Sequence, residues 1–295
     1  MMPLESAASD FAESKAPPAD RLREEDFSRL AALLSSQTGI KLPAAKRLMV
    51  ESRLRRRVRE LGLASLAEYG RTLFEEDGLA HELVHVIDAV TTNKTDFFRE
   101  ADHFDCLANR IVPLLLAGRG EGRLSPLKIW SAASSTGAEA YTIAMVMSDL
   151  AALNNSLRFA ILGTDVSTAA LAAAERAVYP AEMASPVPRD MQDRYLMRGR
   201  DAHARQQVRI VPELRRLVRF ERLNLMDRAY PFDRDVDVIF LRNVLIYFEK
   251  ATQEEVVSRL LSHLRPGGFL ILGHSESMIG TSMRLPQFAQ GVFRK

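Results

Sequence analysis

Residues 129–144 read IWSAASSTGAEAYTIA, and this stretch decides the fold of the chain. Two apolar residues at its start are typical of the end of a buried strand. Six small residues follow, and then come Gly137, the acidic Glu139 and an apolar run with helical spacing. A strand, a tight turn and a helix start bring backbone N–H groups against a ligand, so the pattern predicts a nucleotide-like cofactor at the edge of an open α/β sheet. The turn lacks the G-x-G-x-x-G spacing, which favours a cofactor without a pyrophosphate.

The composition indicates an ordinary globular protein with room for about two domains. The chain has 295 residues, of which 47% are hydrophobic and 26% are charged. Its single cysteine, Cys106, excludes an intramolecular disulfide and fits a reducing compartment. No apolar run reaches the roughly 20 residues that span a bilayer, and the acidic start does not resemble a signal peptide. We therefore expect a cytoplasmic protein with no direct membrane insertion.

The sequence divides into three regions. Residues 1–25 are rich in Ala, Ser, Pro and Glu and have no apolar period, which predicts a disordered tail. Residues 26–90 show apolar side chains at helical spacing and predict a small all-helical domain, with Asp26 as the cap of its first helix. Residues 91–295 alternate strands with helices, which predicts a parallel, doubly wound sheet. The proline-containing stretch 178–212 interrupts this alternation and predicts a small inserted β subdomain.

Polar side chains follow the predicted strands of the sheet. Asp165 ends the strand RFAILGTD, where an acidic residue accepts hydrogen bonds from ribose hydroxyls, although it could instead cap the next helix. Asn224 and Leu225 follow the strand LVRFE and suit an adenine ring, although an asparagine there is also ordinary turn chemistry. Arg242 and Asn243 follow the strand VDVIFL at a site-facing position. Ligands of open α/β sheets bind outside these carboxyl ends.

The segment TTNKTDFFRE at 91–100 is predicted to be a polar loop over the pocket. Phe97 and Phe98 would anchor it, and Arg99 could pair with a carboxylate. A helix cap at Thr95 is the simpler alternative, and the two interpretations are compatible.

Two other signals need weighing. His81 to His85 read HELVH, which matches the helical zinc-protease pattern H-E-x-x-H, but a catalytic zinc needs a third protein ligand that the sequence does not supply. We therefore predict no metal site. Residues 41–60 hold eight Lys or Arg against two Glu, an excess of 8 − 2 = +6. This excess predicts an acidic partner, and the lack of interleaved aromatic residues argues against a single-stranded nucleic acid.

Taken together, these segments resemble the CheR family of chemoreceptor glutamate methyltransferases. The resemblance covers about residues 26–290 and includes, in one order, TTNxTxFFRE, WSAAxSTGxE, RYxMRG, NL, RNVxIYF and GHSE. It implies a helical N-terminal domain, a Rossmann-like class I methyltransferase domain that binds S-adenosylmethionine, and an inserted antiparallel β subdomain. The sequence departs from the family pattern at Ala138, Ala140 and Leu241, none of which is a predicted site residue.

The resemblance also implies roles for individual residues and partners. Arg99 would bind the methionine carboxylate, Glu139 its ammonium group and Asp165 the ribose. The remaining residues predicted to bind S-adenosylmethionine, or its product S-adenosylhomocysteine, are Asn93, Thr95, Asn224, Leu225, Arg242 and Asn243. Arg242 and Tyr247 would meet the incoming substrate carboxylate, and the basic helix would dock the receptor through Arg53, Arg56 and Arg57.

The implied partners are the cytoplasmic helices of methyl-accepting chemoreceptors, with no nucleic acid, and we expect a monomer. Some members bind a tethering peptide at the receptor's C-terminus through the β subdomain, and the resemblance leaves this open here. Two other functions remain as alternatives. One is a non-catalytic module that senses S-adenosylmethionine or S-adenosylhomocysteine, and the other is a methyltransferase of RNA or small molecules.

Overall fold

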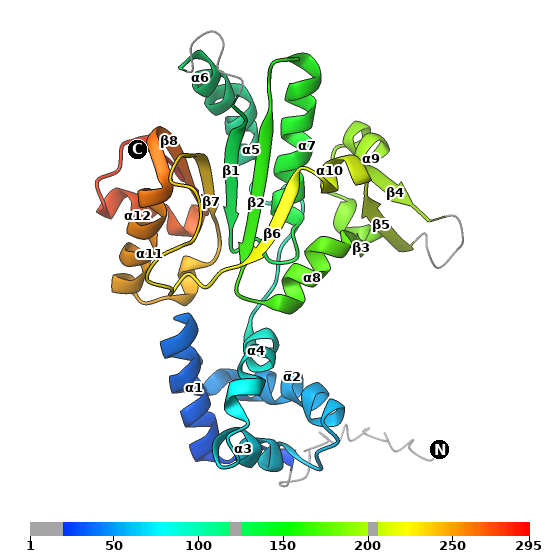
Figure 1. Cartoon of the computed structure of the whole chain (residues 1–295), viewed down its shortest axis with the longest axis vertical. Coiled ribbons are helices and arrows are strands. Elements are labelled where there is room, and N and C mark those ends of the chain that lie inside the picture. Colours follow the sequence, from blue (N-terminus) through cyan, green and yellow to red (C-terminus); the bar gives the residue numbers. More distant parts are fainter. Residues whose placement is uncertain (1–19, 119–124, 200–205) are drawn as a thin grey trace, which may run out of the picture.

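A computed structural model describes residues 20–118, 125–199 and 206–295 of the chain. The described residues form a helical unit below an α/β unit, with a small three-stranded sheet at the side of the latter (Figure 1). The helical unit consists of α1 (Glu24–Thr38), α2 (Arg47–Glu60), α3 (Leu66–Phe74) and α4 (Leu79–Val90). Its apolar stripes meet in a core of their own, which includes Leu30, Leu34, Leu54 and Tyr69.

The start of the helical unit corrects two expectations. Leu22 is buried in the helical core and Asp20 pairs with Arg55, so the predicted tail of residues 1–25 is wrong for residues 20–25. The rest of that predicted tail, residues 1–19, lies outside the described residues. Asp26 does not cap α1, because the helix begins at Glu24 and the buried Asp26 carboxylate accepts hydrogen bonds from Arg23.

The main sheet is a mixed, mostly parallel sheet. Its strand order is β6-β2-β1-β7-β8-β10-β9. The first five strands are parallel to one another, β10 is antiparallel to β8, and β9 is antiparallel to β10. The bounds are β1 (Leu127–Ala132), β2 (Phe159–Asp165), β6 (Val218–Arg222), β7 (Val236–Leu241), β8 (Leu264–Leu272), β9 (Gln287–Ala289) and β10 (Val292–Arg294). The strands RFAILGTD, LVRFE and VDVIFL expected from the sequence coincide with β2, β6 and β7 to within a few residues, and the expected strand end at residues 129–130 lies within β1. The short hairpin of β9 and β10 was not predicted.

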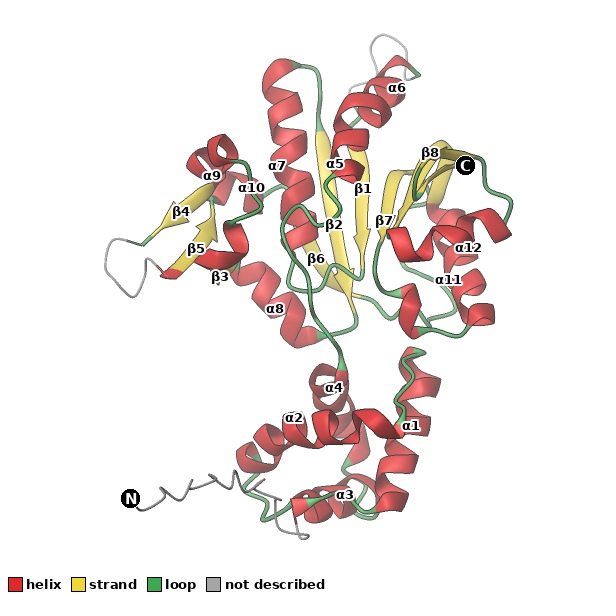
Figure 2. Cartoon of the chain, turned by 180° about the vertical axis from the view of Figure 1, so that it is seen from behind, coloured by secondary structure: helices red, strands yellow, loops and turns green. Residues whose placement is uncertain are grey.

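Alternating side chains of the central strands build two cores, one on each face of the sheet. Ile129 and Phe240 pack with the apolar residues of α7 (Ala138–Leu153), whereas Trp130 and Ile239 pack with those of α11 (Lys250–His263). Because both faces are covered, these strands are mostly apolar and do not alternate, as is usual for parallel strands, apart from Lys128 and Ser131 in β1 and Asp237 in β7. The view from behind shows α7, α8 (Thr168–Arg176) and α5 (Asp102–Cys106) on one side of the sheet (Figure 2).

The remaining elements connect these layers. A five-residue π turn (Leu107–Ile111) joins α5 to α6 (Val112–Ala117), next to Pro113, which has no N–H for the regular helical hydrogen bond. The side sheet pairs β3 (Val178–Pro180) with β5 (Gln207–Ile210) and β5 with β4 (Leu196–Arg198), and α9 (Arg189–Tyr195) and α10 (Pro212–Arg215) flank it. A short helix, α12 (Ser277–Ser282), precedes β9.

The topology fixes where a ligand can bind. The chain moves from β1 outward to β2 and β6, and then returns to the other side of β1 to form β7 and β8. Such a reversal opens a crevice at the carboxyl ends of β1 and β7. The helical unit lies against this edge of the sheet, because α4 runs directly into the segment that crosses it (Figure 1).

Candidate functional site

A pocket opens at the carboxyl edge of the sheet, between the sheet and the helical unit. Its lining comes from the end of α1, the segment after α4, and the loops after β1, β2, β6 and β7. The lining includes every side chain that the sequence predicted for cofactor binding or catalysis: Asn93, Thr95, Arg99, Glu139, Asp165, Asn224, Leu225, Arg242, Asn243 and Tyr247. Residues from six segments of the chain thus meet in one cavity.

The turn after β1 folds tightly enough to bring α7 to the pocket. Ala133 and Ser135 both adopt a positive φ, and Gly137 has φ +89°. A Cβ atom at Gly137 would lie 2.8 Å from the Ala174 Cβ, so both the backbone and the neighbouring helix require glycine. The turn places Glu139 in the first turn of α7, facing the pocket.

Two acidic side chains in the pocket are nearly buried. Glu139 accepts a hydrogen bond from the Ser131 hydroxyl at 2.7 Å, and burial raises the pKa of its carboxyl. Asp165 accepts hydrogen bonds from the backbone N–H groups of Ser135 (2.8 Å) and Ser167 (2.9 Å), and burial raises its pKa as well. Ser167, not Asp165, caps α8, so the simpler interpretation of Asp165 as a helix cap is wrong.

The segment 91–100 crosses the pocket without regular secondary structure up to residue 96, as expected for a pinned polar loop. Phe97 is fully buried and packs edge-on against Tyr179, and the Phe98 N–H donates to the Thr142 hydroxyl at 3.2 Å. No helix begins at Thr95. The Arg99 guanidinium donates only to the Lys94 carbonyl at 3.4 Å and pairs with no carboxylate of the described residues. A positive charge without an acidic partner therefore faces the pocket.

Arg242 is held by two carboxylates below the pocket floor. Its Nη1 lies 3.0 Å from a Glu139 oxygen and its Nη2 lies 3.2 Å from a Glu100 oxygen, and Nη2 also donates to the Arg99 carbonyl. The side chain is only 2% exposed and stacks over the Phe104 ring. A substrate carboxylate could therefore bind the terminal nitrogens of Arg242 only by displacing a partner.

Two further carboxylates, which the sequence analysis did not single out, shape the loop after β7. Buried Glu276 accepts hydrogen bonds from the N–H groups of Asn243 and Leu245, both at 2.7 Å, and of Gly273 at 3.0 Å. These bonds hold Asn243 at φ +58°. Glu100 accepts from the Asn243 side-chain amide at 3.1 Å. Both residues lie within quoted family motifs, FFRE and GHSE, which were the available signal.

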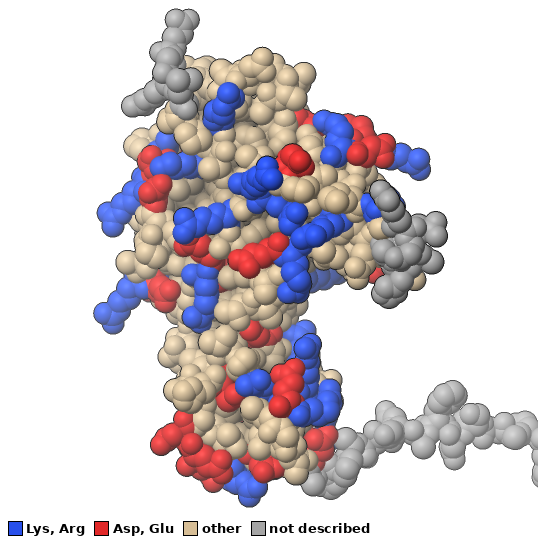
Figure 3. Space-filling view, turned by 45° about the vertical axis from the view of Figure 1, so that its right-hand side comes forward, with Lys and Arg blue, Asp and Glu red and all other residues tan. Residues whose placement is uncertain are grey.

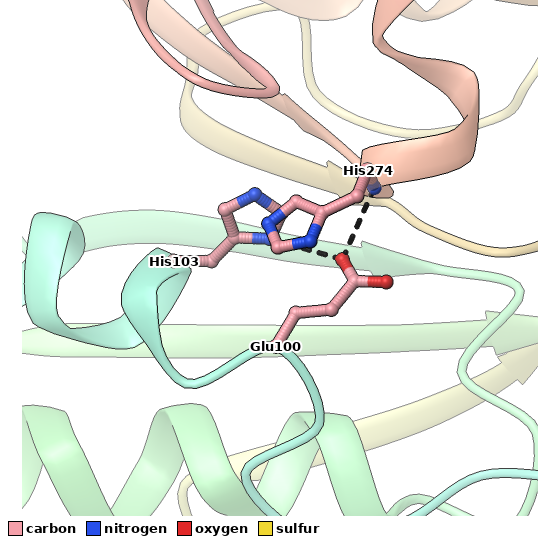
Figure 4. Close-up of side chains that lie close together, drawn as sticks. All are labelled: Glu100, His103 and His274. Carbon is pink, nitrogen blue, oxygen red and sulfur yellow. Dashed lines mark hydrogen bonds and ion pairs between the residues drawn. The ribbon is translucent and has the colours of Figure 1, made fainter.

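Glu100 also forms a cluster with two histidines, His103 of α5 and His274 of the turn after β8 (Figure 4). His103 is buried and its Nδ1 lies 3.4 Å from the carboxylate, while the His274 N–H donates to the same oxygen at 3.3 Å. The three side chains offer ligand atoms within 4.8 Å of one another. Arg242, however, already lies 3.2 Å from that oxygen. Burial, together with the Arg242 charge, lowers the pKa of His103 to about 4. A metal ion would have to compete with this guanidinium, so the cluster favours a structural network.

The adenine side of the predicted site includes the helical unit. The Asn224 side-chain amide donates to the Gln37 carbonyl near the end of α1, and its oxygen accepts from the Met226 N–H at 3.0 Å. Thr38 and Ile40 line the same pocket beside Leu225. The pocket is therefore shared between the helical and α/β units.

The predicted docking arginines of α2 differ in their freedom. Arg53 donates to the carbonyls at the end of α4, including that of Thr91 at 2.9 Å, and Arg57 forms two hydrogen bonds with Glu82, at 2.7 and 2.8 Å. Arg56 forms an ion pair only with Glu60 among the described residues, and its side chain is 83% exposed. Basic and acidic side chains are interspersed on the helical unit (Figure 3). Glu82 is the acid of the H-E-x-x-H sequence, and its bonds to Arg57 and the Tyr69 hydroxyl commit it to the helical core.

No helix in the described part of the chain is both long and apolar enough to cross a membrane. Two family models match the sequence: "CheR methyltransferase, all-alpha domain" at residues 25–91 and "CheR methyltransferase, SAM binding domain" at residues 93–291. The chain is also 39% identical to chemotaxis protein methyltransferase 2 of Pseudomonas aeruginosa, over 91% of this chain and 92% of that protein. It is 37% identical to the chemotaxis protein methyltransferase of Escherichia coli, over 92% of this chain and 91% of that protein.

Proposed function

Because the chain belongs to the CheR methyltransferase family, with its S-adenosylmethionine-binding domain, we propose that it methylates glutamate side chains of chemoreceptors. The product would be a glutamyl methyl ester, formed in the cytoplasm as part of chemotactic adaptation. We further propose that the protein acts as a monomer.

The charge pattern of the pocket is the observation that supports the cofactor assignment. S-adenosylmethionine carries a carboxylate, an ammonium group and a ribose, and it supplies an electrophilic methyl group on its sulfonium. Arg99 offers a cation without an acidic partner, and Glu139 and Asp165 offer two nearly buried carboxylates. The residues thus fit the ligand with one opposite charge or acceptor for each polar group. We propose the remaining lining residues Asn93, Thr95, Asn224, Leu225 and Asn243 as its other contacts.

The chemistry that we propose asks little of the protein beyond alignment. A glutamate side chain has an ordinary pKa near 4.3 and is already ionised at pH 7, so no general base is needed. Fixing two reactants in line contributes up to about 7–11 kcal/mol in favourable cases. Glu276 and Glu100 hold the loop that carries Arg242, Asn243 and Tyr247 in a defined shape, and this loop borders the pocket.

Arg242 has two proposed effects. It fixes the Glu139 carboxylate through their 3.0 Å ion pair, and its charge favours a substrate carboxylate that reaches the pocket beside Tyr247. Because the substrate loses its negative charge in the reaction, tight binding of the ground state would slow turnover. The Arg242 guanidinium is buried and already shared by two acids, so it would bind the substrate carboxylate only weakly.

The proposed reaction is tested by transfer of a tritium-labelled methyl group to chemoreceptor-containing membranes. Label on the receptor that is released as methanol by mild base indicates a methyl ester and supports the proposal. Label on RNA or on a small molecule instead would show a different methyltransferase. Binding of S-adenosylhomocysteine without transfer to any of these would indicate a sensing module.

A further inference from the structure

We propose that the substrate helix packs an apolar residue against Ile246, at an entrance lip formed by Lys46, Lys94, Ile246 and Tyr247. This inference rests on the proposed function, because it concerns how the acceptor glutamate reaches the pocket. It adds a contact, and a sequence requirement on the substrate, that neither the fold nor the family assignment supplies.

Ile246 is an exposed apolar side chain next to the pocket. It is the middle residue of a 3₁₀ turn, Leu245–Tyr247, in which Leu245 is fully buried while Ile246 is 52% exposed. Its chain neighbour Tyr247 lines the pocket. Among the large exposed apolar side chains of the described residues, Ile246 alone is adjacent in sequence to a pocket-lining residue. A single exposed apolar side chain is common on protein surfaces, so Ile246 supports the proposal through its place beside the pocket and the charges around it.

The lip is held in place before any partner arrives. The Glu276 carboxylate accepts the N–H groups of Asn243 and Leu245 at 2.7 Å each, and the Gln253 amide donates to the Leu245 carbonyl at 2.8 Å. A side chain on such a rigid turn loses little conformational freedom on binding. Ile246 is therefore presented to a partner and not left exposed by a loose loop.

The charges around the lip define the partner as acidic. Lys46 places its ammonium over the Tyr247 ring, 5.5 Å from the centroid, and Lys94 is exposed at the pocket edge. Neither forms an ion pair with a carboxylate of the described residues, whereas nearby Lys41 pairs with Glu249 at 2.9 Å. Asp96 of the pocket lining and Glu249, the partner of Lys41, contribute negative charge at this edge. A surface with an apolar centre and unpaired cations fits an amphipathic helix that carries several carboxylates.

The spacing along the lip sets a requirement on that helix. Ile246 and the pocket-lining Tyr247 are successive residues, so their contacts on the partner must be close together. On a helix, side chains three or four positions apart lie on the same face, about 5–6 Å apart. The acceptor glutamate should therefore have an apolar residue three or four positions away, and carboxylates on the flanks of that face.

The test compares receptor methylation by Ile246→Glu, Ile246→Met and Met278→Glu with that of the original protein. Ile246→Glu should raise the KM for receptor about tenfold by removing the apolar contact and adding a repulsive charge, with an unchanged Kd for S-adenosylhomocysteine. Ile246→Met, which keeps an apolar side chain, should have the same KM for receptor as the original protein. Met278, which is 74% exposed and lies away from the pocket lining, provides the matched control and should have no effect.

The outcomes separate this inference from the proposed function. If the original protein forms base-labile ester on the receptor but Ile246→Glu shows the same KM as Met278→Glu, the lip contact is refuted while the function stands. If the original protein forms no ester, the proposed function fails, and the lip contact fails with it.

Discussion

Replacing Glu139 by glutamine tests the central electrostatic contact of the proposed site. The carboxylate is only 13% exposed and lies between the Ser131 hydroxyl and Arg242 Nη1. Glutamine keeps the shape and can still accept from Ser131, but it carries no charge to attract an ammonium group. The expected effect is weaker binding of any ligand that carries this group.

The magnitude follows from the burial of the carboxylate. A hydrogen bond to a charged partner contributes about 1.5–3 kcal/mol when the site is shielded from water. A central value of about 2 kcal/mol corresponds to roughly a thirtyfold increase in Kd. The variant also loses part of its contact with Arg242, so a change in stability accompanies the change in binding and must be separated from it.

A double-mutant cycle between protein and ligand makes this separation. Isothermal titration calorimetry is carried out on both proteins with S-adenosylhomocysteine and with an analogue that lacks the amino group. The original protein should lose about thirtyfold in affinity on removal of the amino group, whereas Glu139→Gln should be nearly indifferent to it.

Glu100→Gln is the matched control for this cycle. Glu100 holds the other terminal nitrogen of Arg242 at 3.2 Å, but it does not line the pocket. This variant disturbs the same ion-pair network and should retain the full response to the amino group. A coupling below about twofold for Glu139→Gln, or an equal coupling for both variants, would refute the reasoning.

Three further predictions concern stability and docking. Gly62 has φ +69° and no atom within 4 Å of an added Cβ, so Gly62→Ala should lower the free energy of unfolding in urea by about 1 kcal/mol. Gly137→Ala should lower it clearly more, because its Cβ would also clash. Equal losses would contradict the crowding at Gly137. The pKa of His103 is lowered to about 4 in the folded protein, so its contribution to the free energy of unfolding is complete above about pH 6.5 and is lost as the pH falls toward 4, by at most about 3 kcal/mol. His103→Gln should therefore flatten the dependence of the free energy of unfolding on pH in this range. An unchanged dependence would exclude His103 as its source. Arg56→Glu should raise the KM for receptor without lowering the Tm. Arg57→Glu should lower the Tm, because Arg57 pairs with the buried Glu82. A lower Tm for Arg56→Glu would show that Arg56 stabilises the fold.

The parts of the fold and site that could be predicted share a local signal. The strand, small-residue turn and helix around Gly137 follow from neighbours in the sequence, and the parallel topology then brings the ends of β1, β2, β6 and β7 to one edge. For this reason Asp165, Asn224 and Arg242 could be expected in one pocket although they are far apart in the chain. What each of these side chains binds there stays a prediction.

The parts that could not be predicted depend on contacts distant in sequence. The excess of eight basic over two acidic residues at 41–60 suggested a strongly positive surface, but Asp20, Glu24, Glu82 and Glu249 pair with four of those cations from elsewhere in the chain. A charge count along a segment cannot detect such partners. The same holds for Glu100, which lies beside the anticipated Arg99 and acts through residues more than 140 positions away.

The junction of α1 with the α/β unit has a consequence for how such proteins can diversify. Gly39, just after α1, approaches Phe248 so closely that a Cβ would lie 2.4 Å from the ring, and the Gln37 carbonyl receives the Asn224 amide. Thr38 and Ile40 contribute to the wall of the pocket that we propose for the cofactor. Recombination that replaced the helical unit alone would therefore also replace part of the binding site. We therefore expect that substitutions on the outer surface of the helical unit can change partner specificity with less effect on the pocket than exchange of the whole unit.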